Sequence, residues 1–259
     1  MLKVRIIPTL LWKKVGLVKG VAFDSWRRVG PVAPAVKVYN TRDVDELILV
    51  DITATQERTV PDYESVHDFA DDCFVPFTVG GGISAVEHIQ SLLRAGADKI
   101  SINSAAYTTP GLIEEAAKRF GAQCVVASID ARRFADGSYR CFSHSGSVAT
   151  DVEPVGWARE LESRGAGEIL VTSIDRDGTM LGYDLALIEA VAQSVNVPVI
   201  ASGGAGNYED MRRAVQEAGA SAVAAASIFH FTQQTPAEAK RYLAAAGVAT
   251  RTAFVAAAR

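Results

Sequence analysis

The sequence predicts a single (βα)8 (TIM) barrel, an α/β fold in which eight parallel strands close into a cylinder surrounded by helices. Three observations predict it. Short apolar runs alternate with amphipathic segments along the chain, which is typical of a parallel sheet. The length of 259 residues is close to the roughly 250 residues of such barrels. The two halves of the chain also resemble each other, which favours a closed barrel with a two-fold half-barrel repeat over an open doubly wound sheet.

The repeat is clearest at two glycine turns. Residues 76–83 (PFTVGGGI) and 198–206 (PVIASGGAG) each read as a strand that stops at glycines. In both copies an Ala-Gly-Ala triplet, another strand and a small polar turn follow, at 95–104 and 218–227. Glycines let the backbone approach a ligand closely, and N–H groups at a helix start attract anions. The repeat therefore predicts two anion sites, although a duplicated fold could also repeat its turns without any ligand.

Each expected element follows from its local pattern. The expected strands are apolar runs that end at glycine, a small polar residue or an acid: 4–11, 46–51, 76–80, 99–103, 124–130, 168–173, 198–202 and 222–226. The expected helices have apolar residues at helical spacing: 32–39, 62–72, a segment from 86, 111–120, 155–164, 185–194, 208–218 and 236–246. Residues 13–28 are expected to be a polar loop that covers a site. Asp136-Gly137 indicates a hairpin turn.

The composition excludes several classes of protein. The net charge of −4 and the scattered basic residues argue against a nucleic-acid partner. Cys73, Cys124 and Cys141 lack metal-ligand spacing and indicate reduced thiols in a cytoplasmic protein. No apolar run reaches the roughly 18 residues of a membrane span, and the first residues do not form a signal peptide. We expect no metal and no cofactor. The barrel is expected to occupy residues 1–251, followed by a disordered Ala-rich tail at 252–259.

Polar residues follow several expected strands, at the end of the barrel where such folds carry their chemistry. They are Asp51, Asn103, Asp130, Thr172 and Ser202. Asp51 could instead cap a helix. Asp130 is the stronger catalytic candidate, because a carboxylate at the mouth of a buried strand needs a partner or a task.

With these residues in place, the chain resembles the cyclase (synthase) subunit of imidazole glycerol phosphate synthase. The motifs that carry the resemblance span nearly the whole chain: 5–8 (RIIP), 78–83 (TVGGGI), 96–99 (GADK), 101–104 (SINS), 172–179 (TSIDRDGT) and 201–206 (ASGGAG). The resemblance implies a barrel that binds a substrate with two phosphates. It also implies a heterodimer with a glutaminase subunit, which docks at the far end of the barrel and supplies ammonia. The implied product is imidazole glycerol phosphate, with release of an aminoimidazole carboxamide ribotide.

The resemblance also assigns roles to residues. One phosphate would bind at Gly82, Asn103 and Ser104, and the other at Asp177, Gly178, Gly204, Ala226 and Ser227. The family's charged ring at the ammonia entrance corresponds to Arg5, Glu46, Lys99 and Glu168, which could alternatively be ion pairs that close the barrel bottom. Lys19 and Asp51 would lie near the reacting centre together with Asp130. Asp98 would contact the partner subunit.

One departure from the family pattern affects the chemistry. The family places catalytic acids at the ends of strands one and five, but only Asp130 is present here, and Leu11 stands at the first position. Thr9 replaces the usual cysteine. Leucine cannot transfer a proton, and general acid–base catalysis typically contributes 10²–10⁴-fold in rate.

Leu11 therefore leaves three interpretations of function. A paralogous branch of the family, associated with glycan amidation, shares the leucine and the segments 16–19 (GLVK) and 44–47 (VDEL). The first interpretation follows this branch: ammonia converts an acetamido sugar to an acetamidino sugar, alongside a sugar amidotransferase. The second is a working cyclase of histidine biosynthesis. The third is a scaffold that channels ammonia without chemistry of its own.

Overall fold

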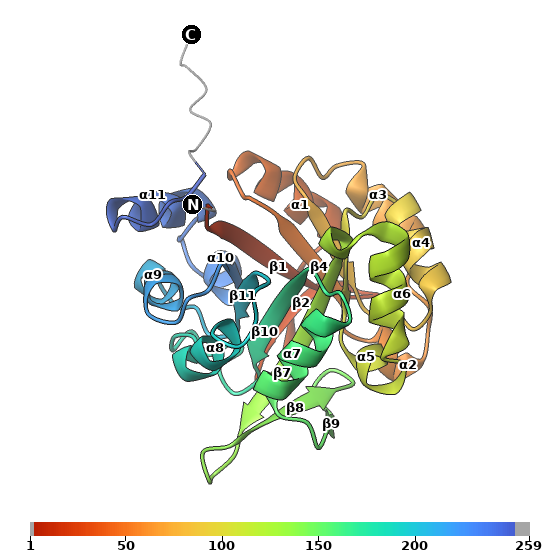
Figure 1. The fold of residues 1–259 in the computed structure, drawn as a ribbon. Helices are drawn as coiled ribbons and strands as arrows, with labels where there is room; N and C mark the ends of the chain where they lie inside the picture. Colours follow the sequence, from red (N-terminus) through yellow and green to blue (C-terminus); the bar gives the residue numbers. More distant parts are fainter. Residues whose placement is uncertain (1–2, 252–259) are drawn as a thin grey trace.

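The computed structural model describes residues 3–251, and these form the closed parallel barrel that the sequence predicts (Figure 1). Eight strands pair in chain order, and the last pairs with the first, with Ile7 opposite Ala224. The barrel strands are β1 (Arg5–Lys13), β4 (Leu47–Asp51), β5 (Phe77–Gly80), β6 (Lys99–Ile102), β7 (Val125–Arg133), β10 (Glu168–Ser173), β11 (Val199–Ser202) and β12 (Ala222–Ala225). An isolated parallel bridge between Val4 and Thr250 joins the two ends of the described chain.

Helices surround the strands (Figure 1). They are α1 (Val32–Thr41), α2 (Ala54–Glu57), α3 (Tyr63–Ala70), α4 (Val86–Arg94), α5 (Ser104–Thr108), α6 (Gly111–Phe120), the 3-10 turn η1 (Ala122–Cys124), α7 (Pro154–Ser163), α8 (Leu185–Ala192), α9 (Tyr208–Gln216), α10 (Ser227–Phe231) and α11 (Pro236–Ala245). The long helices lie within a few residues of their predicted positions. The short helices α2, α5 and α10 were not predicted, because a single turn has too few residues to show a periodic pattern.

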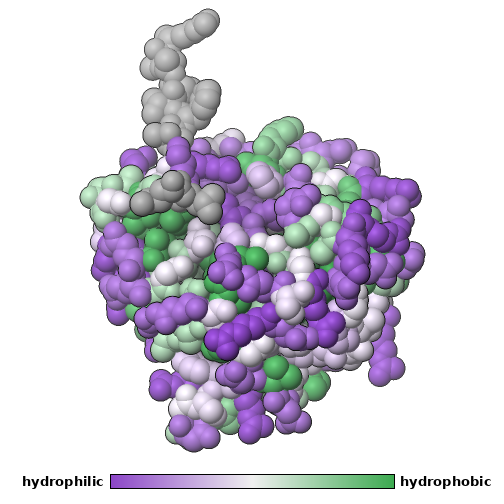
Figure 2. Space-filling view, in the orientation of Figure 1, coloured by the Kyte–Doolittle hydropathy of each residue, from purple (hydrophilic) through white to green (hydrophobic). Residues whose placement is uncertain are grey.

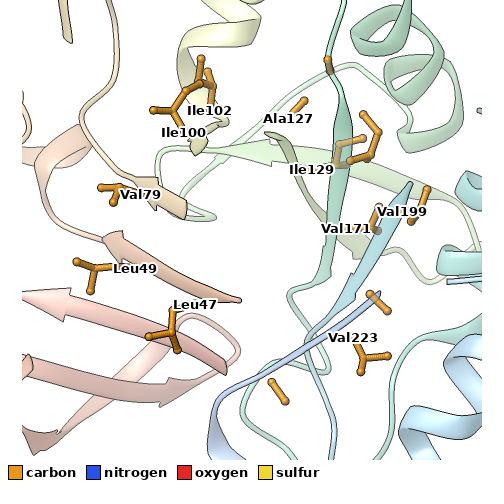
Figure 3. Close-up of a cluster of buried hydrophobic side chains, with 14 of the residues drawn as sticks. Leu47, Leu49, Val79, Ile100, Ile102, Ala127, Ile129, Val171, Val199 and Val223 are labelled. Carbon is orange, nitrogen blue, oxygen red and sulfur yellow. The ribbon is translucent and has the colours of Figure 1, made fainter. Parts of the chain in front are cut away.

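The strand residues alternate between two apolar layers. Leu47 and Leu49 of β4 point outward and join the large cluster between strands and helices, part of which Figure 3 shows. Ile48 points inward and packs with Ile7 and Leu170 inside the barrel. This alternation is the period-two pattern of a strand that is buried on both faces. The barrel interior is therefore a packed core that separates the two ends of the barrel.

Two antiparallel hairpins extend the carboxyl end of the barrel. The prediction of a polar loop at 13–28 is wrong. This segment forms an antiparallel hairpin, in which β2 (Gly16–Val21) pairs with β1 and with β3 (Asp24–Gly30). The hairpin predicted at Asp136-Gly137 is confirmed, since β7 continues past the barrel and pairs with β8 (Tyr139–Ser143), which in turn pairs with β9 (Val148–Ala149). The alternating pattern of 16–21 was hidden by its glycines. Both hairpins start from barrel strands that carry candidate site residues.

The tail at 252–259 lies outside the described residues. The face in Figure 2 is mostly hydrophilic, with small separate hydrophobic areas. In the described part of the chain, no helix is long and apolar enough to cross a membrane.

Candidate functional site

A cavity of about 390 Å³ opens at the carboxyl ends of the barrel strands, and its wall is built by seven of the barrel strands and by the glycine turn that follows β5. The predicted site residues at this end of the barrel all line it: Leu11, Lys19, Asp51, Gly82, Asn103, Ser104, Asp130, Thr172, Asp177, Gly178, Ser202, Gly204, Ala226 and Ser227. The structure therefore brings together both halves of the internal repeat around one cavity.

Asp130 lies on β7 and points into this cavity. The side-chain amide of Asn103, which directly follows the neighbouring strand β6, donates a hydrogen bond to its Oδ2 atom at 2.9 Å. Burial, the largest cause, and the nearby Asp177 carboxylate together raise the pKa of Asp130 from 3.8 to about 7, and the Thr172 hydroxyl partly opposes the shift. At neutral pH the carboxyl is therefore present in both protonation states. Such a group can either accept or donate a proton, which is the requirement for general acid–base catalysis near pH 7.

Leu11 lines the same cavity, and the other two acids that line it among residues 3–251, Asp51 and Asp177, already have partners of their own. Leu11 pairs with Val18 of the first hairpin and with Val50 of β4. Asp51 Oδ1 accepts hydrogen bonds from the backbone N–H groups of Thr53 and Ala54, at 2.8 and 3.1 Å, so this carboxylate holds the turn after β4. This side of the cavity is thus apolar where the family pattern has an acid.

Lys19 and Asp177 form an ion pair in the cavity wall. Lys19 Nζ lies 2.5 Å from Asp177 Oδ2, and the lysine side chain is only 2% exposed. Burial raises the pKa of Asp177, and the Lys19 ammonium opposes that shift. The backbone N–H of Ala22 also donates to the Asp177 carbonyl, at 2.8 Å. The pair therefore fastens the β2–β3 hairpin to the loop after β10.

The two glycine turns have the backbone conformation that their sequence predicts. Gly82 and Gly204 have φ values of +69° and +114°, a region that favours glycine. A Cβ on Gly82 would lie 2.8 Å from the Thr59 carbonyl oxygen, and one on Gly204 would lie 2.2 Å from that of Gly182. We call the set Gly82, Asn103 and Ser104 the first cradle, and the set Gly178, Gly204, Ala226 and Ser227 the second cradle.

Three buried polar atoms in the cavity wall have no hydrogen-bond partner in the described structure: Thr9 Oγ1, Asn103 Oδ1 and Ser227 Oγ. Buried polar groups are nearly always paired, so each such atom needs a partner from a ligand or from water. One of these atoms lies in each cradle, and Thr9 lies between them on β1. The cavity is therefore suited to a polar ligand that reaches from one cradle to the other.

The loop between β8 and β9 also closes over the cavity, which the sequence did not indicate. The backbone N–H of His144 donates to Ser104 Oγ at 2.9 Å, and Ser145 Oγ donates to the Ile52 carbonyl at 3.0 Å. Phe23, from the first hairpin, packs beside Gly146 of the same loop. His144, Ser145 and Phe23 line the cavity together with Trp26. The only sequence signal was the hairpin turn at 136–137, which places this loop over the barrel mouth.

The predicted charged ring, Arg5, Glu46, Lys99 and Glu168, lies at the opposite end of the barrel. Each cation contacts both acids: Arg5 lies 2.8 and 3.0 Å from Glu46 and Glu168, and Lys99 lies 3.0 and 2.9 Å from them. The acids raise the pKa of Arg5 enough to outweigh burial, which is the largest single influence and lowers it. The ring is therefore a closed set of alternating charges across the amino end of the barrel.

Asp98 lies beside this end, where Oδ2 accepts a hydrogen bond from the backbone N–H of Phe77 at 2.8 Å. This bond fixes the start of β5 and leaves the residue exposed. Within residues 3–251, no group of three or more His, Cys, Asp or Glu side chains is arranged to hold a metal ion.

Two comparisons with known proteins agree with this geometry. The model of the histidine biosynthesis protein family matches residues 5–235. The imidazole glycerol phosphate synthase subunit HisF of Hyphomonas neptunium (strain ATCC 15444) is 51% identical over 252 residues, which cover 97% of this chain and 100% of the relative. The comparisons support the histidine-biosynthesis interpretation better than the sugar-amidination interpretation, for which they provide no evidence.

Proposed function

The chain belongs to the histidine biosynthesis protein family, and on that premise we propose that it is the cyclase subunit of an imidazole glycerol phosphate synthase. In this proposal it uses ammonia from a glutaminase subunit to act on a substrate with a phosphate at each end. The products would be imidazole glycerol phosphate and an aminoimidazole carboxamide ribotide. The 51% identity to a HisF subunit over its full length supports this assignment.

The observation that carries the proposal is the position of Asp130 between two glycine-built cradles. The first cradle would hold one phosphate through the Gly82 backbone and the polar groups of Asn103 and Ser104. The second cradle would hold the other through the Gly204 backbone and the Ser227 hydroxyl. The unpartnered Ser227 hydroxyl can donate a hydrogen bond to a phosphate oxygen in the second cradle, whereas the unpartnered Asn103 Oδ1 is an acceptor and would take a donor from the substrate or from water. A substrate anchored at its two ends would place its middle beside Asp130, and such positioning is a large part of catalysis.

Proton transfer would then rest on Asp130. Because the pKa of this carboxyl is about 7, it can take a proton in one step and return it in another. The hydrogen bond from Asn103 would hold the carboxylate toward the substrate. Lys19 would supply positive charge beside it and, through Asp177, keep the hairpin closed over the cavity. Closure excludes water, which strengthens electrostatic interactions inside the site.

Ammonia would enter through the charged ring at the amino end. The ring stands on the barrel axis between the protein surface and the apolar interior. A neutral ammonia molecule could cross that interior, whereas an ammonium ion would pay a large desolvation cost. The glutaminase subunit would dock over this end, where Asp98 is exposed.

Leu11 favours a second candidate function, the amidination of an acetamido sugar. With one acid missing, a cyclase reaction that needs two proton carriers would lose about 10²–10⁴ in rate. An amidination reaction would use the same ammonia route, and a sugar amidotransferase would then be a further partner. A scaffold that only channels ammonia would likewise tolerate Leu11.

The test is turnover of the purified chain with ammonium chloride and the doubly phosphorylated ribotide substrate of the cyclase, alongside rescue of a histidine auxotroph that lacks the cyclase gene. The proposal predicts both turnover and rescue, and an Asp130→Asn variant should lose both. An Asp71→Asn variant, which makes the same change at an exposed residue that does not line the cavity, serves as the matched control and should keep both. Failure of the wild-type chain in both assays would refute the cyclase assignment. A scaffold would tolerate Asp130→Asn in a reconstituted complex, and an amidinating enzyme would not.

A further inference from the structure

A second cavity of about 290 Å³ lies outside the barrel mouth, between the β7–β8 hairpin, the loop after β10 and helix α9. Its charged lining consists of Arg133, Arg176 and Arg213 together with Asp184 and Asp210. None of these residues lines the main cavity. The cavity therefore belongs to no step of the proposed function and does not depend on it.

The two carboxylates in this cavity are already occupied by other donors. Asp184 begins helix α8, where it accepts from the backbone N–H of Leu187 at 3.2 Å and from the Tyr139 hydroxyl at 2.9 Å. Asp210 accepts from the backbone N–H groups of Gly206 and Asn207, at 2.9 and 3.1 Å. Their charges thus stabilise helix starts and backbone turns.

The arginines, in contrast, keep most of their donors available. Among the described residues, Arg133 and Arg176 form no ion pair through their side chains, although two carboxylates line the same cavity. Arg176 donates one hydrogen bond, to the Leu181 carbonyl at 3.4 Å. Arg213 pairs with Glu217 on its own helix, outside the cavity lining. Arginine presents five donors in a planar fork, which suits phosphate oxygens.

The backbone of the cavity wall offers further N–H donors beside the arginines, although the Asp184 carboxylate caps the same helix. Helix α8 begins in the wall, and Leu185 and Ala186 are its first residues. The first N–H groups of a helix have no partner within the helix, and they carry its positive end. One concave space is thus lined by two arginines without acid partners, by a third arginine and by the start of a helix.

From this arrangement we propose that the cavity is a binding site for a small phosphorylated molecule. Arg133 and Arg176 would clamp a phosphate or pyrophosphate group, while the N–H groups of Leu185 and Ala186 bind its inner oxygens. The volume suits one such group with a small organic part, and a macromolecular segment would not fit inside it.

Ligand binding in the second cavity would also affect the main cavity, because one loop lines both cavities. Gly178 and Met180 of that loop line the main cavity, whereas Leu181 and Gly182 line the second one. The Gly182 N–H donates to the carbonyl of Gly204, in the second cradle, at 2.8 Å. A phosphate bound outside would therefore stiffen the loop that carries the second cradle.

The test is a titration of the chain with sodium pyrophosphate, followed by amide NMR. The Leu185 and Ala186 amides report on the second cavity, and the Gly82 and Ser104 amides report on the main one. We expect saturable shifts at Leu185 and Ala186. In an Arg133→Gln, Arg176→Gln double variant these shifts should need at least tenfold more pyrophosphate, with the Gly82 and Ser104 response unchanged.

Arg94→Gln is the matched control, since Arg94 is exposed and forms no ion pair among the described residues. It should behave as the wild type. The proposal is overturned if the Leu185 and Ala186 amides do not saturate, if the double variant titrates like the wild type, or if Arg94→Gln weakens the response equally. These outcomes do not depend on turnover, so they are separate from failure of the cyclase assignment.

Discussion

Lys19 Nζ lies 2.5 Å from Asp177 Oδ2, and this contact joins the β2–β3 hairpin to the loop that carries the second cradle. The lysine side chain is 2% exposed and the aspartate side chain 12%. A buried pair contributes little net stability when intact, but loss of one partner leaves an uncompensated buried charge. The same ion pair therefore holds the hairpin over the site and affects the stability of the fold.

Lys19→Met should lower the free energy of unfolding by about 3 kcal/mol at pH 8. The loss should be smaller at pH 4.5, because burial raises the pKa of Asp177, and protonation removes the unpaired charge. Urea denaturation at the two pH values measures both effects. Lys14→Met is the matched control: its partner Glu57 is exposed, so the change should cost less than about 1 kcal/mol. Equal losses in the two variants would contradict this account.

Asp130→Asn should stabilise the fold at alkaline pH while removing activity. The folded-state pKa of Asp130 is about 7, raised from 3.8, so between these values the folded state binds more protons than the unfolded state. The stability of the wild type therefore falls as the pH rises from 4 to 7 and stays low above 7. The asparagine variant lacks this loss.

We expect the stability advantage of Asp130→Asn over the wild type to be larger at pH 8 than at pH 4 by on the order of 4 kcal/mol, because folding raises the pKa of Asp130 from 3.8 to about 7. Denaturation of both proteins at the two pH values checks it. Asp136→Asn provides a control in which the pH dependence of the stability difference has the opposite sign. The Ser138 hydroxyl and backbone N–H lower the pKa of Asp136, so the wild type should gain stability relative to this variant as the pH rises. If the free energies of unfolding of Asp130→Asn and the wild type differ by the same amount at both pH values, the carboxyl is not buried in the way the structure indicates.

Leu11→Asp should increase ammonia-dependent cyclase turnover. The substitution returns a carboxyl to the end of β1, in the same cavity as Asp130, and a second proton carrier is worth about 10²–10⁴-fold when it is well placed. We expect a gain of at least about tenfold in kcat, measured with ammonium chloride as nitrogen source. Leu11→Asn has nearly the same shape and cannot carry the proton, so it should give no gain. If both variants lose activity equally, the leucine serves the natural reaction of this chain, as amidination of a sugar would allow.

The barrel could be predicted because its two apolar layers appear in the sequence as apolar runs for the strands and as apolar residues at helical spacing for the helices. Strands such as β10 and long helices such as α6 fall at their predicted residues, since each buries a continuous run or a full helical face. The β2–β3 hairpin was missed, because Gly16 and Gly20 read as loop residues. In the structure, a Cβ on Gly20 would lie 2.0 Å from the Asp24 carbonyl oxygen. These glycines permit close strand pairing instead of a flexible loop.

The site was predictable where the chain repeats itself and unpredictable where distant segments meet. The convergence of both glycine turns on one cavity could be predicted, because each turn has a copy in the other half; phosphate binding at these turns stays a prediction. The contact of Ser104 with His144 could not be predicted, because 40 residues separate them and no local pattern encodes the pair. The raised pKa of Asp130 also depends on burial and on Asp177. Only the folded arrangement brings these groups together.

Gly82→Ala should weaken binding of phosphate at the first cradle. A Cβ there would lie 2.8 Å from the Thr59 carbonyl oxygen, and the φ of +69° strains any other residue. We expect at least tenfold weaker binding of inorganic phosphate by calorimetry, and a stability loss of about 1–2 kcal/mol. Gly111→Ala is the control: nothing lies within 4 Å of its Cβ position at the start of α6. That change should stabilise the fold by up to about 1 kcal/mol and leave phosphate binding intact.

Lys99→Met tests whether the charged ring admits ammonia from a partner. Lys99 contacts both Glu46 and Glu168, so its loss leaves two acids that share only Arg5. We expect glutamine-driven turnover, with the glutaminase subunit present, to fall at least tenfold relative to ammonia-driven turnover of the same variant. The reason is that ammonia added in bulk can enter at the open barrel mouth, whereas ammonia from the partner must cross the ring. Lys118→Met removes an exposed pair on helix α6 and should change neither rate. If Lys99→Met lowers both rates in proportion, the ring only closes the barrel bottom and plays no part in ammonia transfer.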